Sequence, residues 1–190
     1  MSVPQLERAN ADFVTEFLAV GGDLPRDIEC AVGDAVELVR VGGVGYVLDC
    51  RIEAEEELWS CIPGVEYCWD GIDDAGQRVP EEWFERITDG THAAIAAGGV
   101  VLTHCHMGVN RGPSAGFAVL LREGWDPVAA LTAIRAARPV AVMAYAEDAV
   151  EWNLDRIGAT AAVRTATRAR VRRWRAANPL PMARAIRLAS

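Results

Sequence analysis

The stretch between Gly98 and Leu121 constrains the fold of this chain more than any other part of its sequence. It opens with an apolar run of strand length, residues 98–102, and closes with an apolar run of helical length, residues 115–121. Glycine and polar residues lie between the two runs, as is typical of a loop. This order predicts a strand, a loop and a helix, which is the repeating unit of α/β proteins.

Cys105 and Arg111 mark the two ends of the predicted loop. The N–H groups at a helix N-terminus lack hydrogen-bond partners, and together with the helix dipole they favour an anion. Arg111, six positions after Cys105, adds a planar guanidinium that fits two oxygens of a phosphate. The same donors would favour the ionised form of Cys105, which is the nucleophilic form of a thiol. The loop is therefore predicted to hold a phosphate group and to attack its phosphorus.

The pattern His104-Cys105-x5-Arg111, with Gly108 inside the loop, resembles the signature of the cysteine-dependent protein phosphatases. The size of the chain resembles the compact dual-specificity group, and the resemblance covers residues 13–157. It implies an α/β fold with a central, mostly parallel sheet flanked by helices. It also implies hydrolysis of phosphomonoesters through a phosphocysteine intermediate on Cys105, without a metal or another cofactor.

The same resemblance implies roles for the other residues of the loop. Arg111 is expected to hold the phosphate oxygens together with the backbone N–H groups of the residues before it. His106 and Met107 are expected at the mouth of the pocket, where their side chains would shape substrate choice. His104 either steadies the loop by hydrogen bonds to the backbone or is simply packed. The residues expected to surround the phosphate are His106, Met107, Gly108, Val109 and Asn110.

The position after Arg111 departs from the family pattern. Members usually carry Ser or Thr there, and its hydroxyl steadies the thiolate as it leaves in the hydrolysis step. This chain has Gly112, followed by Pro113 and Ser114. Two interpretations follow: either hydrolysis of the intermediate is slow, or Ser114 reaches back to the thiolate from the first helical turn.

An acidic turn supplies candidates for a general acid, which the reaction needs because an alkoxide is a poor leaving group. In the family this group is an Asp roughly thirty residues before the Cys. Asp74 and Asp73 lie 31 and 32 residues before Cys105. Asp74 is preferred because the aromatic pair 83–84 should anchor the following helix, and Asp70 ranks third. The alternative is that this cluster is only a solvated turn.

The rest of the chain alternates between strand and helix patterns, which predicts an α/β layer with the loop at the carboxyl end of a central strand. The acidic run at residues 53–57 is interpreted as a solvated loop or the start of a helix. Strands are expected over residues 13–20, 44–48, 65–69 and 98–102. Helices are expected over residues 25–40, from Pro80 to Gly98, from Pro127 to Pro139, and over 145–157. A further helix is expected to follow the loop and to end at Gly124.

Charge divides the chain into two parts. Residues 1–158 contain all 27 acidic residues and 11 Arg, whereas residues 159–190 contain eight Arg and no acid. We expect a phosphatase domain over 1–158 and an Arg-rich helical extension over 159–190. The helix expected over 160–178 either packs on the acidic body of its own chain, which we favour, or binds nucleic acid, an acidic partner or an anionic membrane.

The cysteines and the N-terminus indicate the compartment. The start of the chain resembles neither a signal peptide nor a membrane span, so we expect a cytoplasmic protein. The five cysteines lack metal-type spacing and fit free thiols. Cys50 ends a predicted strand, and Leu48-Asp49-Cys50 resembles the place of a cysteine that forms a disulfide with the nucleophile in some lipid-directed members of the superfamily. The alternative, which we favour, is that Cys50 is a small buried hydrophobe.

Three functions remain open. The leading one is a phosphomonoester hydrolase acting on phosphorylated Tyr, Ser or Thr in proteins or on a small phosphorylated molecule. The second is an RNA 5′-phosphate or triphosphate hydrolase, because Asn110-Arg111 resembles the RNA triphosphatases of capping enzymes. The third is a phosphate-binding module without catalysis, which the Gly112 departure would explain.

Overall fold

A single mixed sheet forms the centre of the computed structural model, which describes residues 3–53 and 57–189. Within these residues the sheet has five strands in the order β1-β2-β5-β3-β4. β1 pairs antiparallel with β2, and the other three pairings are parallel. The prediction of a mostly parallel α/β sheet is confirmed. The strands are β1 (Ala11–Phe13), β2 (Leu18–Gly21), β3 (Val44–Arg51), β4 (Glu66–Ile72) and β5 (Val100–His104).

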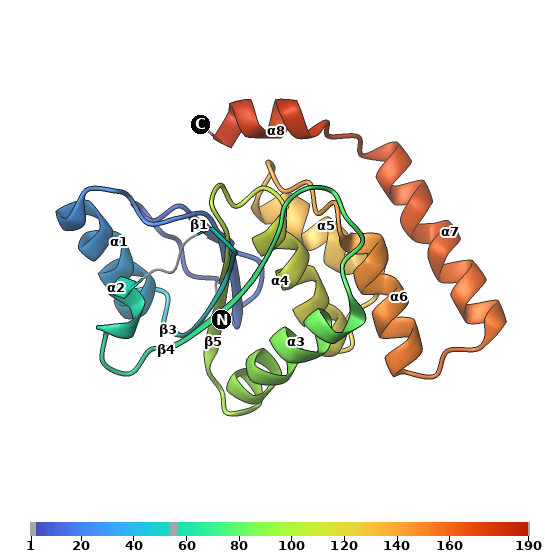
Figure 1. The fold of residues 1–190 in the computed structure, drawn as a ribbon, viewed down its shortest axis with the longest axis horizontal. Helices are drawn as coiled ribbons and strands as arrows, with labels where there is room; N and C mark the ends of the chain where they lie inside the picture. The colour runs from blue at the N-terminus through green and yellow to red at the C-terminus, as the bar shows by residue number, and fades with distance from the viewer. Residues whose placement is uncertain (1–2, 54–56, 190) are drawn as a thin grey trace.

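Helices cover both faces of the sheet (Figure 1). One core packs α1 and α2 against one face, and the larger core packs α3 to α6 against the other face. Trp59 is buried in the first core, and Phe117 of α4 is buried in the second. The helices are α1 (Ile28–Arg40), α2 (Glu57–Ser60), α3 (Glu81–Ala96), α4 (Arg111–Arg122), α5 (Pro127–Ala137), α6 (Ala146–Arg156), α7 (Ala161–Ala177) and α8 (Met182–Ala189).

The sequence signals set most helix boundaries. Asp126 caps α5 by accepting hydrogen bonds from two backbone N–H groups of the first turn, and Pro127 follows at the first helical position. Asp27 caps α1 in the same way, so this helix starts at Ile28 rather than at residue 25 as expected. A side-chain acceptor in front of the helix therefore marks its start more accurately than the apolar pattern does.

One strand expectation is wrong. Residues 13–20 do not form a single strand, because the chain reverses between β1 and β2 and the two strands pair antiparallel. The N–H groups of Val14 and Thr15 both donate to the Leu18 carbonyl, at 2.8 and 3.2 Å. The hydroxyl of Thr15 also accepts from the Phe17 N–H at 3.2 Å. These local bonds close a tight turn inside a run of strand-forming residue types.

α7 packs along α5 and α6, on the right of the molecule in Figure 1. Five of its six arginines pair with acidic residues of the same chain; for example, Arg164 lies 2.6 Å from Asp155, and Arg170 lies 2.8 Å from Asp126. This is the favoured interpretation of the Arg-rich segment, packing on its own acidic body. The division into domains at residue 158 stays a prediction.

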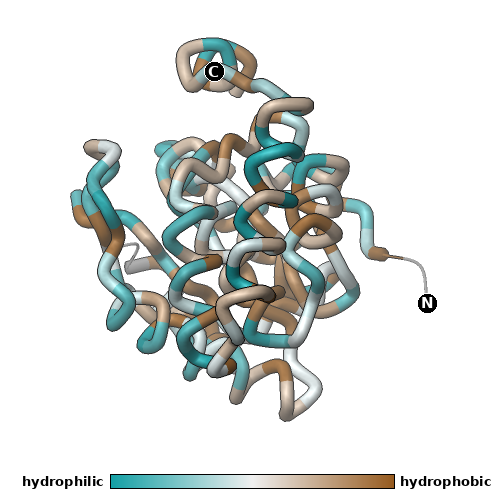
Figure 2. Tube along the Cα trace, turned by 90° about the vertical axis from the view of Figure 1, so that its right-hand side faces the viewer, coloured by the Kyte–Doolittle hydropathy of each residue, from teal (hydrophilic) through white to brown (hydrophobic). Residues whose placement is uncertain are grey.

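α8 lies at the top of both Figure 1 and Figure 2, and its Ala185 is fully buried. It follows α7 through a short connection that contains two prolines, residues 179 and 181. In the described ranges no helix combines the length and the hydrophobicity needed to cross a bilayer.

Candidate active site

The predicted loop lies at the carboxyl end of β5, between the two neighbouring strands β2 and β3. Cys105 is the first residue after the strand and is only 3% exposed. Its N–H donates to the Gly21 carbonyl at 3.3 Å, which extends the pairing with β2 by one residue. The loop then turns through Gly108, whose φ of 63° suits glycine, and α4 begins at Arg111.

The backbone carbonyls of residues 106–109 in the loop bind groups outside it. The His106 carbonyl accepts from the Asp23 N–H at 3.0 Å, and the Val109 carbonyl accepts from the Val142 N–H at 2.7 Å. The two carbonyls between them accept from Arg138: Nη2 donates to Met107 at 3.0 Å and Nε to Gly108 at 2.6 Å. Four successive carbonyls are thus turned outward.

The N–H groups of the same peptide units must point the other way, because C=O and N–H are opposed across a planar trans peptide. These are the N–H groups of residues 107–110, and within the described residues none of them donates to an acceptor. They form a concave set of donors of the kind that binds anions. Arg138, which maintains this set, is 5% exposed and also binds Asp12 at 2.7 Å and Asn10 at 2.8 Å. Its role has no sequence signal beyond an Arg before a proline.

Arg111 lies beside this set with one edge of its guanidinium occupied. Nη1 and Nη2 each donate to the Glu53 carboxylate at 2.6 Å, and Nη1 also donates to the Ile72 carbonyl at 3.2 Å. Nε is buried and has no hydrogen-bond partner among the described residues. A guanidinium carries five N–H donors. Nε and the second N–H of Nη2, which share the other edge, remain available for a ligand.

The ion pair with Arg111 corrects the interpretation of Glu53. The sequence predicted a solvated acidic run, but the hydrogen bonds from Arg111 lower the pKa of Glu53 to about 2. Its side chain is still 47% exposed. Of the other members of the run, Glu57 begins α2, and residues 55 and 56 lie outside the described residues.

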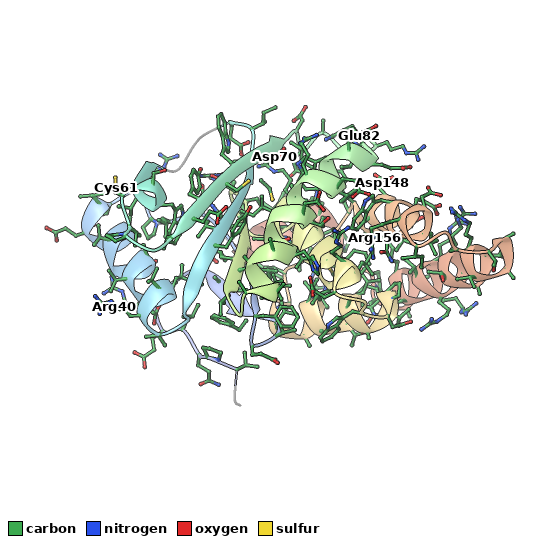
Figure 3. All side chains as sticks on the ribbon, turned by 90° about the horizontal axis from the view of Figure 1, so that it is seen from below. Arg40, Cys61, Asp70, Glu82, Asp148 and Arg156 are labelled. Atoms are coloured by element: carbon green, nitrogen blue, oxygen red, sulfur yellow. The ribbon has the colours of Figure 1, made fainter. Side chains whose placement is uncertain are left out.

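The three candidate acids lie in different places. Asp74 reaches the loop: its Oδ1 accepts from Asn110 Nδ2 at 2.6 Å, and its Oδ2 lies 3.6 Å from Arg111 Nε. The Asp73 carboxylate instead accepts from the N–H of Asp74 at 2.7 Å and is exposed. Asp70 lies on β4 beside the start of α3 and pairs with Arg86 at 2.9 Å (Figure 3). The structure brings only Asp74 into contact with the loop.

Tyr145 is a residue of this site that the sequence did not reveal. Its hydroxyl donates to Asp74 Oδ1 at 3.1 Å. Burial, together with the charge of Asp74, raises the pKa of Tyr145 to about 12. The phenol therefore remains a neutral donor to Asp74 at physiological pH.

Gly112 has no room for a side chain. A Cβ at this position would lie 2.9 Å from the Cα and carbonyl carbon of His104, because α4 starts against the end of β5. The Ser or Thr of the family pattern cannot stand here unless the helix moves. Ser114 lies two residues further on, and its hydroxyl is 3.5 Å from Asn110 Oδ1. No hydrogen bond joins it to Cys105 in the described part of the chain.

His104 is packed rather than hydrogen-bonded. It is 1% exposed, its ring contacts Trp59 at a centroid distance of 6.4 Å, and burial lowers its pKa. Its Nε2 lies 3.7 Å from Asp49 and has no hydrogen-bond partner in the described ranges. Of its two predicted roles, the packed one agrees with this environment.

A series of ion pairs runs from the buried end of β3 to His106 of the loop. Arg51 joins the buried Asp49 at 2.7 Å to Asp23 at 2.8 Å. His106 Nδ1 lies 2.6 Å from the second oxygen of Asp23, and its side chain is 60% exposed. Met107 is partly exposed beside it. Both side chains therefore lie at the mouth of the loop, where they were expected.

Cys50 and Cys105 lie level with each other on adjacent parallel strands. The register of β3 and β5 aligns Asp49 with His104, the residues just before the two cysteines. Both cysteines are buried free thiols in the same core. Burial and the proximity of Cys105 raise the pKa of Cys50. Adjacent strands lie about 4.8 Å apart, which is within the reach of a disulfide.

Within residues 3–53 and 57–189 no cluster of three or more His, Cys, Asp or Glu side chains has the arrangement needed to hold a metal ion. The loop itself is lined by backbone N–H groups and a guanidinium, which are donors and not metal ligands. The chemistry of the site is therefore that of an anion-binding loop with a cysteine at its start.

The fold is that of the dual-specificity phosphatases. It is similar to human DUSP28 (TM-score 0.63, 22% identity, 80% of this chain and 97% of that one). PTPMT1 in complex with PI(5)P is similar too (TM-score 0.65, 18% identity, 77% and 96%), as is Tk-PTP in its active form (0.63, 21%, 77% and 97%). No protein-family model and no curated protein matches the sequence. At these identities the similarity shows the fold.

Proposed function

We propose that this protein is a cysteine-dependent phosphatase that hydrolyses phosphomonoesters. One observation carries the proposal: the free N–H groups of residues 107–110 and the free edge of Arg111 lie together in the loop that Cys105 begins. Buried donors normally have partners, so a concave set of donors that finds no acceptor among the described residues is suited to bind an anion. A tetrahedral phosphate offers enough oxygens to satisfy them.

The reaction follows from the positions of these groups. The Cys105 thiolate attacks phosphorus, a phosphorus–sulfur bond forms, and the bond to the leaving oxygen breaks. The donors of the loop and Arg111 stabilise the charge on the three remaining oxygens. Water then attacks the phosphocysteine, which releases inorganic phosphate and restores the thiolate.

Asp74 is the proton donor for the leaving oxygen in this proposal. It lies next to Arg111, and Asn110 and Tyr145 fix its Oδ1. Its Oδ2 remains available to carry the proton. In the second step the same carboxylate accepts a proton from the attacking water.

The proposed substrates are phosphoproteins and small phosphorylated molecules. A cleft of about 380 Å³ lies beside the loop and is lined by His106 of the loop and by Glu53. It has room for the part of the substrate that carries the phosphate. PTPMT1 has been solved with PI(5)P, so phosphoinositides belong in a substrate panel. The cleft has an apolar wall of Leu24, Pro25, Ile28, Ala31 and Leu58.

Hydrolysis of RNA 5′-phosphates has less support. The arginines of α7 that would bind RNA pair with acidic residues of the body, including Arg164 with Asp155 and Arg170 with Asp126. The side chain of Asn110, which suggested this activity, faces Asp74 and the backbone of Ala144. Binding of RNA that weakens steeply with salt would restore this alternative.

Turnover of an aryl phosphate, with and without vanadate, tests the proposal. Cys105→Ser should abolish turnover while vanadate still binds, because the donors do not need the sulfur. Arg111→Ala should lose both. Cys61→Ser is a matched control, since Cys61 is an exposed free thiol that directly follows α2. A Cys105→Ser variant that keeps a substantial fraction of turnover would exclude the thiol mechanism, and a wild type that binds vanadate without turnover would indicate a non-catalytic module.

A further inference from the structure

The segment between α5 and α6 contains an unusual backbone conformation. Met143 has a φ of 54°, which is the left-handed region, and its side chain is fully buried. This region is unfavourable for a residue with a Cβ, and the surrounding structure must hold the residue there. In the described part of the chain it is the only residue other than glycine with a positive φ.

The turn at Met143 connects the segment to the catalytic loop. The N–H of Val142, on one side, donates to the Val109 carbonyl at 2.7 Å. The N–H of Ala144, on the other side, donates to Asn110 Oδ1 at 2.6 Å. Both bonds require the chain to reverse at Met143. The left-handed residue therefore orients the side chain of Asn110, which is 2% exposed.

The C-terminal helix α7 supports this turn. Arg175 Nη1 donates to the Met143 carbonyl at 2.9 Å. The preceding residue, Trp174, packs under Arg135 at 5.5 Å, and Arg135 Nε donates to the Ala141 carbonyl at 2.8 Å. Val171 of α7 is 1% exposed and anchors the helix in the core. The end of α7 thus holds the segment from the side opposite to the catalytic loop.

The contacts continue from Asn110 to the proposed acid. While Oδ1 of Asn110 accepts from Ala144, its Nδ2 donates to Asp74 Oδ1 at 2.6 Å. An amide held at both ends cannot rotate without breaking one of these bonds. The conformation of the turn at Met143 consequently sets the position of the Asp74 carboxyl group.

We propose that Arg175 is a positioning residue for proton donation, and that α7 is part of the catalytic unit rather than an appendage. Arg175 holds Met143 in its left-handed conformation, Ala144 then orients Asn110, and Asn110 orients Asp74. The inference rests on the proposed function, in which Asp74 donates a proton to the leaving oxygen.

The effect should be confined to that proton transfer. Arg111 is held by Glu53 and Ile72, and the loop carbonyls of Met107 and Gly108 are held by Arg138. None of these contacts passes through Arg175. The fourth carbonyl, that of Val109, accepts from the Val142 N–H, and Arg135 holds the chain on that side of the turn through the Ala141 carbonyl without Arg175. Loss of Arg175 should therefore leave the anion site intact and disturb only substrates that need a protonated leaving group.

The test compares Arg175→Ala with wild type in the full chain. We expect kcat on an alkyl phosphate to fall by about tenfold, a part of the hundredfold or more that general acid catalysis supplies. We expect kcat on an aryl phosphate and inhibition by vanadate to change by less than about twofold, because a phenolate leaves without much protonation. Arg175→Lys, which keeps a donor near the Met143 carbonyl, should recover part of the alkyl phosphate rate.

Arg172→Ala is the matched control. Arg172 lies on the same helix as Arg175, is 71% exposed, and lies 3.7 Å from Glu147. Arg175 also lies 3.6 Å from Glu147, so the control removes an equivalent ion pair without touching the Met143 turn. It should behave as wild type on both substrates.

Equal losses on alkyl and aryl phosphates, or the same loss in Arg172→Ala, would overturn the inference in favour of a general structural role. An unchanged alkyl rate in Arg175→Ala would also overturn it, while the proposed function would stand if Asp74→Asn still loses alkyl turnover selectively. If Asp74→Asn shows no such selectivity, the assignment of the acid fails instead.

Should Arg175→Ala not fold, the Lys variant decides: a selective alkyl loss supports the inference, and a wild-type ratio of the two rates contradicts it.

Discussion

Glu53 binds both terminal nitrogens of Arg111 at 2.6 Å and leaves Nε without a hydrogen-bond partner in the described residues. The guanidinium is thus oriented before a phosphate arrives, and a group that is already oriented loses less entropy on binding. Glu53→Gln should lower kcat/KM by about ten- to a hundredfold, since small misplacements of such groups are costly. Glu66→Gln, at an exposed position of β4, is the control. Tighter phosphate binding in Glu53→Gln would instead mean that Glu53 competes with the substrate.

The same pair predicts a dependence of stability on pH. Arg111 lowers the pKa of Glu53 from 4.5 to about 2, so the folded state binds this proton less readily than the unfolded state. The stabilisation is present above pH 4.5 and disappears as the pH falls towards 2. The difference in unfolding free energy between wild type and Glu53→Gln should shrink over this range. It should be modest at neutral pH because Glu53 is half exposed, and a difference that grows on acidification would contradict the pair.

The two neighbouring acids should behave differently. Asp74→Asn should reduce turnover of alkyl phosphates by about a hundredfold or more, and of aryl phosphates much less. Asp73→Asn is the adjacent control and should have little effect, because its carboxylate binds the backbone of the turn. The measurement is kcat on a series of leaving groups. Equal and small losses for both variants on the poorest leaving group would show that neither is the acid.

Cys50 should protect Cys105 from irreversible oxidation. A thiolate is oxidised to a sulfenic acid by peroxide, and a neighbouring thiol then displaces water to form a disulfide. We expect peroxide to inactivate the enzyme, a dithiol to restore it, and peptide mapping to find a link between Cys50 and Cys105. Cys50→Ser should recover poorly, whereas Cys30→Ser, at an exposed position of α1, should recover as wild type does. Full recovery of Cys50→Ser would end this idea and leave Cys50 as a buried hydrophobe.

Gly112 should not tolerate the hydroxyl residue of the family pattern. Gly112→Ser places a Cβ 2.9 Å from the backbone of His104, so we expect a loss of about 1–3 kcal/mol in the free energy of unfolding. Gly45→Ala is the control, because its nearest contact would be at 3.9 Å. Denaturant unfolding measures both. A Gly112→Ser variant with wild-type stability and faster turnover would contradict this expectation. It would show that α4 can shift to make room for the serine side chain and that a hydroxyl at this position speeds hydrolysis of the intermediate.

The parts of the site that the sequence revealed are those that lie close together along the chain. The strand before Cys105, the loop and the start of α4 follow from local patterns and agree with the structure. The spacing of Asp74 from Cys105 was expected from the family resemblance. It is compatible with the fold, because β4 and β5 both run parallel to β3 and end at the same edge of the sheet. The roles of the residues in the reaction stay predictions.

The contacts that the sequence did not reveal join distant segments. Arg138 reaches Asp12, and Arg111 reaches Glu53, through packing that no local pattern encodes. Asp74, Asn110 and Tyr145 come from three separate segments in the same way. In the sequence, an Arg beside a proline or a Glu in an acidic run resembles an ordinary surface residue. Its function is visible only in the tertiary structure, because its partner lies far away along the chain.

The outward carbonyls of the loop bear on how such a site can change over evolution. Backbone atoms and Arg138 hold the curvature of residues 106–109, so the shape of the anion site does not depend on the side chains of His106 and Met107. Both side chains reach solvent at the mouth of the loop. Substitutions at these two positions can alter which phosphoester is preferred while the phosphate-binding backbone is inherited unchanged. Paralogues of this chain should therefore diverge in selectivity first at these two side chains.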